Sequence, residues 1–313
     1  MASEKSPARY YYDLTRIRKF PRGCDLVIWP SAWGLLLAAN NYDIDPRSLA
    51  ILHLWLAVGS TILHSGICVL NDILDRDLDA KVERTKNRPL VTGAVPVFNA
   101  SVFCAVLLAI PIYMLSYTNP TAFKWGILGV FPFHGLYPLM KRVTYWPQAW
   151  LGFAMNWGLV VGYLTVSRGQ WDPQILTLLT GTIGWSILYD TMYAYQDVKD
   201  DVKVGIKSTA ILFGPTHGRK ILAGFASAFL AALYFAGVQN GQGFYYFLFS
   251  VGGAGLHLAW QLGTWKQDNW DDCWSKLASN GDLGTLVWLG LFFDYCVKNG
   301  VTTGLMARSV GAL

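Results

Sequence analysis

Two features that decide the fold stand together in residues 49–79, which read LAILHLWLAVGSTILHSGICVLNDILDRDLD. Residues 49–70 contain no Asp, Glu, Lys or Arg, so they suffice for one helix to cross the hydrocarbon core of a membrane. The nine residues that follow include Asp72, Asp75, Asp77 and Asp79. We therefore expect a membrane-spanning helix that ends in a run of acidic side chains.

The whole chain alternates in this way between long apolar and short charged segments. Of its 313 residues, 53% are hydrophobic and 14% are charged, and the mean hydropathy is +0.31. Soluble domains carry about 25% charged residues. Because only helices and closed barrels satisfy their backbone polar groups within lipid, the composition predicts an all-α integral membrane bundle.

We predict nine spans in a single domain over residues 25–297, preceded by a segment 1–24 and followed by a polar tail 298–313. The predicted spans are 25–40, 49–70, 97–116, 121–139, 149–166, 174–196, 219–238, 243–262 and 282–297.

The distribution of basic residues supports this count independently. The N-terminal segment and the loops after the second, fourth, sixth and eighth spans hold 20 of the 25 Lys and Arg. The other face holds Arg47, Lys124, Arg168, Lys298 and Arg308. Cytosolic loops carry an excess of Lys and Arg, so the richer face is predicted to be cytosolic. The net charge of +5 then reflects orientation, and no nucleic acid partner is expected.

The acidic residues after the second span are spaced for one helix face. Asn71, Asp75 and Asp79 are four residues apart, so each advances by about 40° around a helix axis. Asp72 lies close enough in angle to join them. Asp77 points away and is predicted to be solvated.

A second acidic segment, Asp197-Val-Lys-Asp-Asp201, follows the sixth span, four spans later, so it lies on the same face. One such cluster alone is as easily a solvated helix end as a metal site, whereas two on one face favour a metal. Hard oxygen ligands suit Mg2+. The predicted metal ligands are Asn71, Asp72, Asp75, Asp79, Asp197 and Asp201.

Basic residues surround both acidic segments. They are Arg84, Lys86, Arg88, Lys141, Arg142, Lys199, Lys203 and Lys207. Acids alone would indicate a cation site, whereas acids among this many bases indicate a metal-bridged anion whose phosphoryl oxygens the bases neutralise. Taken singly, Lys86 and Arg142 are as readily explained as membrane-edge anchors.

At this point the sequence resembles a known family. Asn71-Asp-x-x-Asp-x-x-x-Asp79 is similar to the NDxxDxxxD motif of the UbiA-type intramembrane aromatic prenyltransferases. Asp197-x-x-x-Asp201 resembles their second motif, DxxxD, and Tyr137-Pro-Leu-Met-Lys141 their YxxxK motif. The motifs occur in the family's order, and the resemblance covers about residues 16–297.

The resemblance implies nine helices around a central cavity, capped by the loops after the second and sixth spans. Two Mg2+ ions would bridge the aspartates to a prenyl diphosphate whose tail lies among the helices. The residues expected to bind the diphosphate are Asn71, Arg84, Arg88, Lys141 and Lys203. Those expected to act in catalysis are Asp75, Asp197, Tyr137 and Lys141.

The expected reaction is transfer of a farnesyl-type prenyl group to a phenolic acceptor, as in meroterpenoid biosynthesis. The alternatives are a 4-hydroxybenzoate polyprenyltransferase of ubiquinone biosynthesis, a terpene cyclase on the same scaffold, and a transporter. A transporter would place charges near the midplane of its spans, whereas the acids of this chain cluster at helix ends, with Asp190 inside the last turns of the sixth span as an exception. An alcohol phosphotransferase is excluded because its DGxxAR segment is absent.

The expected partners are the prenyl diphosphate, the aromatic acceptor and the lipid bilayer, with no obligate protein partner. Glu4 and Asp13 are unlike a mitochondrial transit peptide, so the endoplasmic reticulum of a eukaryote or the inner membrane of a bacterium is preferred to the mitochondrial inner membrane. The five cysteines lack metal-ligand spacing and are predicted to be free thiols.

Overall fold

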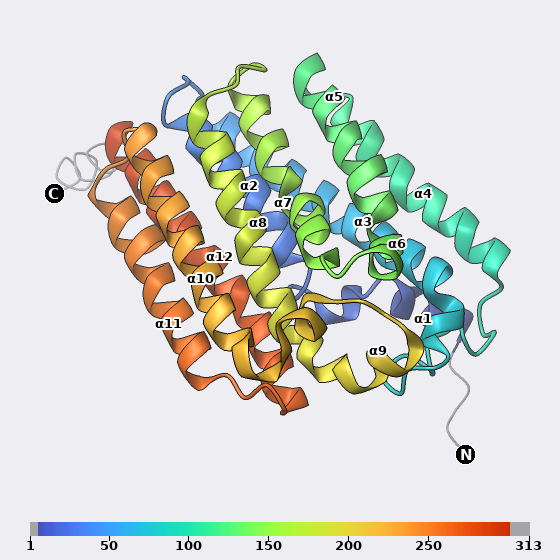
Figure 1. Cartoon of the computed structure of the whole chain (residues 1–313). Helices are drawn as coiled ribbons and strands as arrows, with labels where there is room; N and C mark the ends of the chain where they lie inside the picture. The colour runs from blue at the N-terminus through green and yellow to red at the C-terminus, as the bar shows by residue number, and fades with distance from the viewer. Residues whose placement is uncertain (1–5, 301–313) are drawn as a thin grey trace, which may run out of the picture.

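The computed structural model describes residues 6–300, and every regular element in that range is helical (Figure 1). The α-helices are α1 (Pro7–Leu14), α2 (Asp25–Ala39), α3 (Pro46–Asp79), α4 (Val97–Leu115), α5 (Pro120–Leu128), α6 (Gly135–Val143), α7 (Pro147–Val166), α8 (Pro173–Ala194), α9 (Val198–Val204), α10 (Thr209–Gln239), α11 (Ala254–Thr264) and α12 (Trp270–Lys298). Two π-helical turns are η2 (Gly129–His134) and η4 (Tyr246–Gly253), and two 3-10 turns are η1 (Ile17–Lys19) and η3 (Tyr195–Asp197).

Each predicted span coincides with one helix or one continuous helical run. The fourth is α5–η2–α6 and the eighth is η4–α11. Four helices, α3, α4, α7 and α10, are long and apolar enough to cross a membrane. That all nine runs cross it stays a prediction, and the predicted tail lies outside the described residues from position 301 onward.

Three helices extend beyond the predicted spans by nine residues or more. Helix α3 continues through the aspartates to Asp79, α10 begins at Thr209, and α12 begins at Trp270. In each case the helix is longer than its apolar stretch: α3 extends beyond it at the C-terminal end, and α10 and α12 at the N-terminal end. Polar turns extend the helices beyond the apolar core because the backbone hydrogen bonds and caps persist there, as where Asn269 caps α12 by accepting from the Asp272 amide.

Helix α2 is the buried centre of the bundle. Nearly all of its 15 residues are buried, which fits a helix that is apolar all round. It packs against α7, α3 and α12. A Cβ on Gly34 would lie 2.1 Å from the Leu159 carbonyl oxygen, and one on Gly162 would lie 2.3 Å from the Ser31 carbonyl oxygen. Only glycine therefore allows α2 and α7 to approach this closely.

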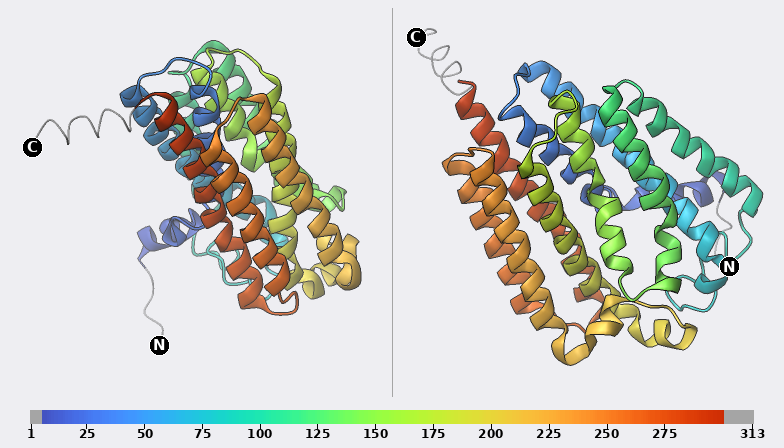
Figure 2. Two further views of the ribbon diagram at one scale, coloured as in Figure 1. Left: turned by 90° about the vertical axis from the view of Figure 1, so that its left-hand side faces the viewer. Right: turned by 45° about the horizontal axis from the view of Figure 1, so that its top comes forward.

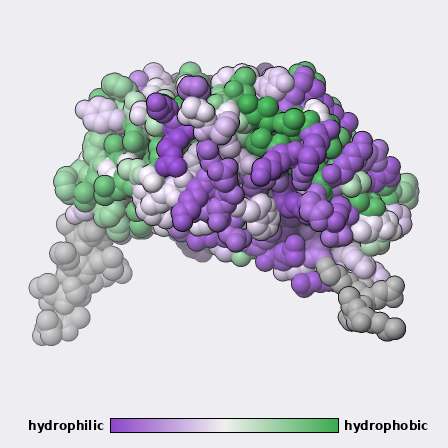
Figure 3. All heavy atoms as spheres, turned by 60° about the horizontal axis from the view of Figure 1, so that its bottom comes forward, coloured by the Kyte–Doolittle hydropathy of each residue, from purple (hydrophilic) through white to green (hydrophobic). Residues whose placement is uncertain are grey.

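The C-terminal ends of α3, α6 and α8 meet at one end of the bundle, beside α1 and α9 (Figures 1 and 2). Arg84, after α3, contacts Asp197 after α8, while Lys141 near the end of α6 contacts Asp75 of α3. Hydrophilic side chains gather over the middle of this end of the molecule, whereas hydrophobic ones dominate one of its flanks (Figure 3). The elements that carry all three motifs thus converge.

Candidate active site

The last turns of α3 present their acidic residues to the protein interior. Asp75 is fully buried, and Asp72 and Asp79 are 1% and 7% exposed. Asn71 lies beside them on the cavity wall. Asp77 projects outward and pairs with the exposed Arg76 at 3.0 Å. Helical spacing alone therefore separates the interior carboxylates from the solvated one.

Two arginines neutralise Asp72 and Asp79. The Nη2 of Arg16 donates to both oxygens of Asp72, at 2.6 and 2.8 Å. The Nη1 of Arg88 donates to Asp72 at 2.8 Å and to Asp79 at 2.6 Å. The predicted phosphate-binding residue Arg88 thus bridges two predicted metal ligands.

Asp75 is held by the two basic residues near the end of α6. Lys141 donates to Asp75 Oδ2, and Arg142 approaches Oδ1 at 3.5 Å. Arg142 also donates to the Leu74 carbonyl oxygen at 2.6 Å. Arg142 is therefore more than a membrane-edge anchor, because it ties α6 to α3.

The second motif joins the first through Arg84. The guanidinium of Arg84 donates to both oxygens of Asp197, with the shortest contact 2.8 Å. Asp201, on α9, is buried, and burial together with the neighbouring Asp197 raises the pKa of the Asp201 carboxyl to about 7.

Lys203 does not reach the cavity. Its side chain is exposed and pairs with Asp200 at 3.0 Å, one turn earlier on α9. That Lys203 binds the diphosphate therefore stays a prediction, and its outward orientation in this structure does not favour it. Lys203 and Asp200 share the outer face of the short helix, whereas Asp201 lies on its inner face.

Two adjoining hollows, which we call together the polar cavity, lie between the motifs. Residues Asp79, Arg84, Tyr137, Lys141 and Tyr193 line both hollows. One hollow adds Arg16, Asn71, Asp72 and Arg88, and the other adds Asp190, Asp197 and Asp201. All the predicted site residues except Asp75 and Lys203 therefore line one or both of these adjoining hollows.

Lys19 adds to the positive charge of this space, which it lines near Arg16. Burial and the positive charges of Arg16 and Arg18 lower the pKa of the Lys19 amine. A cavity that crowds cations to this degree favours an anionic ligand.

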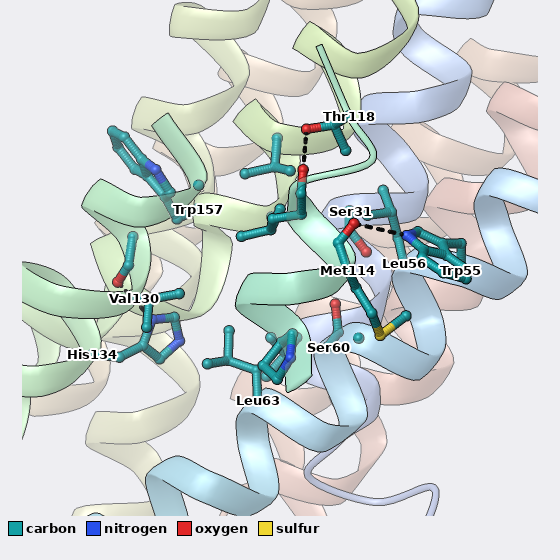
Figure 4. A pocket seen from close by; sticks show the side chains of 18 of the residues that line it. Ser31, Trp55, Leu56, Ser60, Leu63, Met114, Thr118, Val130, His134 and Trp157 are labelled. Atoms are coloured by element: carbon teal, nitrogen blue, oxygen red, sulfur yellow. Dashed lines mark hydrogen bonds between the residues drawn. The ribbon is translucent and has the colours of Figure 1, made fainter. Parts of the chain in front are cut away.

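An apolar pocket adjoins the polar cavity (Figure 4). Helices α2, α3, α4, α5 and α7 and the turn η2 enclose it, with Trp55, Leu63, Met114 and Trp157 among its lining residues. His134 and Ala154 line both spaces. A cavity lined by charged residues and a pocket lined by apolar residues therefore lie side by side.

The carboxylates fit a hard divalent cation in chemistry, although they are now paired with bases. Among residues 6–300, no three His, Cys, Asp or Glu side chains are arranged around one metal position. The raised pKa of Asp201 disfavours its ionised form, and a nearby cation would stabilise that form. Mg2+ bound together with a diphosphate would satisfy both sets at once, because the acids would turn to the metal and the bases to the phosphates.

Sequence interpretation did not single out Arg16 and Tyr193 for the site. Arg84 lies over the Tyr193 ring at 5.8 Å. Tyr193 lies four residues before Asp197, the same spacing as in the aspartate series. Helical periodicity could therefore have predicted that Tyr193 shares a face with Asp197. No local pattern indicates Arg16, since its pairing with Asp72 joins positions 56 residues apart.

The sequence model of the UbiA prenyltransferase family matches residues 27–287. A relative named UbiA prenyltransferase claS, from Ampulloclitocybe clavipes, is 42% identical over 93% of this chain and 92% of its own length. The mitochondrial 4-hydroxybenzoate polyprenyltransferase of Schizosaccharomyces pombe is 36% identical over 93% of this chain and 81% of its own length.

Solved structures share the fold at lower identity. A UbiA homologue from Aeropyrum pernix K1 superposes with a TM-score of 0.73 at 21% identity, covering 86% of this chain and 97% of its own. A UbiA homologue from Archaeoglobus fulgidus bound to DMAPP and Mg2+ gives 0.68 at 16% identity, covering 92% and 99%. Motifs, fold and relatives agree, and this chain belongs to the UbiA prenyltransferase family, as a membrane-embedded prenyltransferase.

Proposed function

We propose that this protein transfers a prenyl group, farnesyl-type in preference, from a prenyl diphosphate to a phenolic acceptor and releases diphosphate. The observation that carries the proposal is the junction of the polar cavity with the apolar pocket. A prenyl diphosphate has the same division, because a charged head is joined directly to a hydrocarbon tail.

The roles of the residues follow from their positions. The residues that would hold the two Mg2+ ions are Asn71, Asp72, Asp75, Asp79, Asp197 and Asp201, and bound Mg2+ would supply positive charge that stabilises the leaving diphosphate. In this structure Arg84 pairs with Asp197, Arg88 with Asp72 and Asp79, and Lys141 with Asp75. When the carboxylates turn to a cation, the same three bases become free to bind phosphoryl oxygens.

Tyr137 and Tyr193 complete the polar cavity near the three bases. The phenolic hydroxyl of Tyr137 can donate to a phosphoryl oxygen. Departure of the diphosphate leaves an allylic cation, and aromatic faces stabilise cations without reacting as strong bases. Attack by an electron-rich acceptor ring then forms the carbon–carbon bond, and the ring loses one proton to a carboxylate or to an oxygen of the released diphosphate.

The acceptor is the least constrained part of the proposal. Several relatives are 4-hydroxybenzoate polyprenyltransferases, at 36–38% identity, and they favour that acid as a second candidate. A phenolic acceptor of a meroterpenoid pathway in the endoplasmic reticulum is the first candidate. The two differ in both acceptor and donor length, so one assay separates them.

The test uses membranes that contain the full chain, with Mg2+, DMAPP, geranyl, farnesyl and longer diphosphates, and a panel of phenols and phenolic acids. Products are identified by mass spectrometry. A farnesylated phenol supports the first candidate, and a polyprenylated 4-hydroxybenzoate supports the second. A cyclised hydrocarbon without an acceptor, or no product with any pair, would contradict both.

Asp75→Asn provides the mechanistic variant, and Asp77→Asn is its matched control on the same helix turn. Asp75 is buried in the site, whereas Asp77 is exposed. We expect Asp75→Asn to lower turnover by at least about a hundredfold, the usual effect of removing a group that stabilises transition-state charge. Asp77→Asn should keep wild-type turnover.

A further inference from the structure

One residue that lines both spaces, His134, has a buried ring nitrogen without a hydrogen-bonding partner among the described residues. His134 is 5% exposed, and its Nδ1 lies 2.9 Å from the Gly129 carbonyl oxygen. A carbonyl oxygen can only accept, so Nδ1 carries the proton and donates. The Nε2 atom of the neutral ring is then an acceptor, and it contacts no donor within residues 6–300.

The local backbone holds the ring in this orientation. His134 ends η2, a π-helical turn, and its hydrogen bond reaches back five residues to Gly129. Single π-turns inside helices frequently occur at functional sites. A Cβ on Gly129 would lie 2.4 Å from Trp157 Cδ1, so glycine allows the turn to pack against the wall of the apolar pocket.

His134 also lies between the two spaces, where the proposed function places the reacting carbon of the prenyl diphosphate. It lines both the polar cavity and the apolar pocket, and among residues 6–300 only Ala154 also lines both. Figure 4 shows His134 on one side of the pocket with Trp157, and Trp55 and Leu56 on the other. In a prenyl diphosphate the reacting carbon lies between the charged head and the tail. The acceptor ring must therefore approach the same junction.

We propose that His134 Nε2 accepts a hydrogen bond from the phenolic hydroxyl of the acceptor and so positions its ring for attack. This inference rests on the proposed function. A buried acceptor atom left unsatisfied is costly, and a phenol supplies the missing donor while its apolar ring stays at the pocket mouth. Ala154, the other residue at the junction, has no polar side-chain atom to offer.

The test compares His134→Phe and His134→Gln with the wild type. Phenylalanine keeps a ring but removes the acceptor, whereas glutamine carries an oxygen that can accept at a similar reach. His257→Phe is the matched control, because His257 also has an unpaired Nε2 but lines neither the polar cavity nor the apolar pocket. The readouts are the KM for acceptor and for donor, kcat, and acceptor-independent hydrolysis of the prenyl diphosphate.

We expect His134→Phe to raise the acceptor KM by about ten- to a hundredfold, the usual effect of one lost buried hydrogen bond. Its donor KM and its acceptor-independent hydrolysis should stay within about twofold of wild type. Glutamine should recover most of the loss, and His257→Phe should behave as wild type. An acceptor whose hydroxyl is methylated should not distinguish wild type from His134→Phe.

An unchanged acceptor KM in His134→Phe would overturn the inference, and so would equal loss of diphosphate hydrolysis in both His134 variants, which would indicate a structural role. The wild-type protein tests the proposed function separately. If the wild type prenylates no phenol, the proposed function fails, whereas a failed His134 comparison in an active wild type removes only this inference.

Discussion

At the scale of residues, the site is a set of acids and bases that currently neutralise one another. Arg16 and Arg88 hold Asp72, Lys141 holds Asp75, and Arg84 holds Asp197. Buried charges are tolerated only in pairs, because an unpaired one loses its hydration without compensation. In this structure the bases that we propose to bind the diphosphate therefore act as counter-ions for the carboxylates that we propose to bind the metal.

Replacement of Arg88 by Gln tests this reciprocity. Asp79 loses its basic partner, and we expect the protein without Mg2+ to lose about 3 kcal/mol of stability, a typical cost of unpairing a buried charge. Added Mg2+ should raise the melting temperature more than in wild type, because Asp79 no longer has a competing cation. Thermal unfolding in detergent, with and without Mg2+, measures both effects.

Arg76→Gln is the control for this experiment. Arg76 is exposed and pairs only with the exposed Asp77 among the described residues, so its stability should change by less than about 0.5 kcal/mol. If Mg2+ raises the melting temperature of Arg88→Gln no more than that of wild type, then Arg88 and Mg2+ do not compete for Asp79, and the proposal that the carboxylates exchange bases for metal is contradicted.

The second motif allows a matched pair on adjacent elements. Asp197→Asn should lower Mg2+-dependent prenyl transfer by at least about a hundredfold, because Asp197 faces the polar cavity and joins the two motifs through Arg84. Asp200→Asn should retain activity, because Asp200 pairs outward with Lys203. Radiolabelled product formation in membranes measures both, and equal losses would contradict the assigned faces.

At the scale of elements, two local devices shape the site. The close contact of α2 with α7 fixes the position of α7, which forms a wall of the apolar pocket. The turn η2 places His134 where it lines both the apolar pocket and the polar cavity. Both depend on glycines that leave no room for a side chain. Protein interiors are packed at crystal-like density, so an atom added at such a contact displaces the neighbouring residues.

Gly34→Ala tests the first device. The new Cβ would meet backbone atoms of α7, which cannot move away as a side chain could, so we expect a loss of at least about 2 kcal/mol. Gly224→Ala is the control in α10, where a Cβ meets nothing within 4 Å. There alanine should stabilise the helix by roughly 0.5 kcal/mol. Opposite shifts in melting temperature are the expected result.

At the scale of the whole molecule, the arrangement of helices sets the sidedness of the site. Helix α7 starts at Pro147, beside the end of α6, and its 20 residues span about 30 Å. The segment 167–172 therefore lies at the opposite end of the bundle from the polar cavity. That separation matches the thickness of a bilayer core.

Cysteine labelling tests the predicted orientation. The five native cysteines are free and are first replaced. A single cysteine in place of Lys86 should react with a membrane-impermeant maleimide only from the cytosolic side, and one in place of Gln170 only from the opposite side. Labelling of both from the same side would contradict the predicted span parity.

The sequence by itself determined the membrane-embedded helical class, the helix-end aspartates and the convergence of the three motifs. Each of these follows from local spacing. The length of the apolar runs identifies helices, a four-residue period places Asn71, Asp75 and Asp79 on one helix face, and the predicted span parity brings Asp197 to the same end. Local spacing is preserved in any packing of the helices, so it can be read without the fold.

Only the tertiary structure decided which groups meet. The pairing of Arg16 with Asp72, the outward direction of Lys203 and the position of His134 between two cavities depend on helix rotation and close packing. Those properties arise from contacts between residues far apart in the chain, such as Gly34 with Leu159, and no nearby residue encodes them. The aspartates at the end of α3 could therefore be predicted as a candidate site from the sequence. Their counter-ions and the position of the apolar pocket beside them could not.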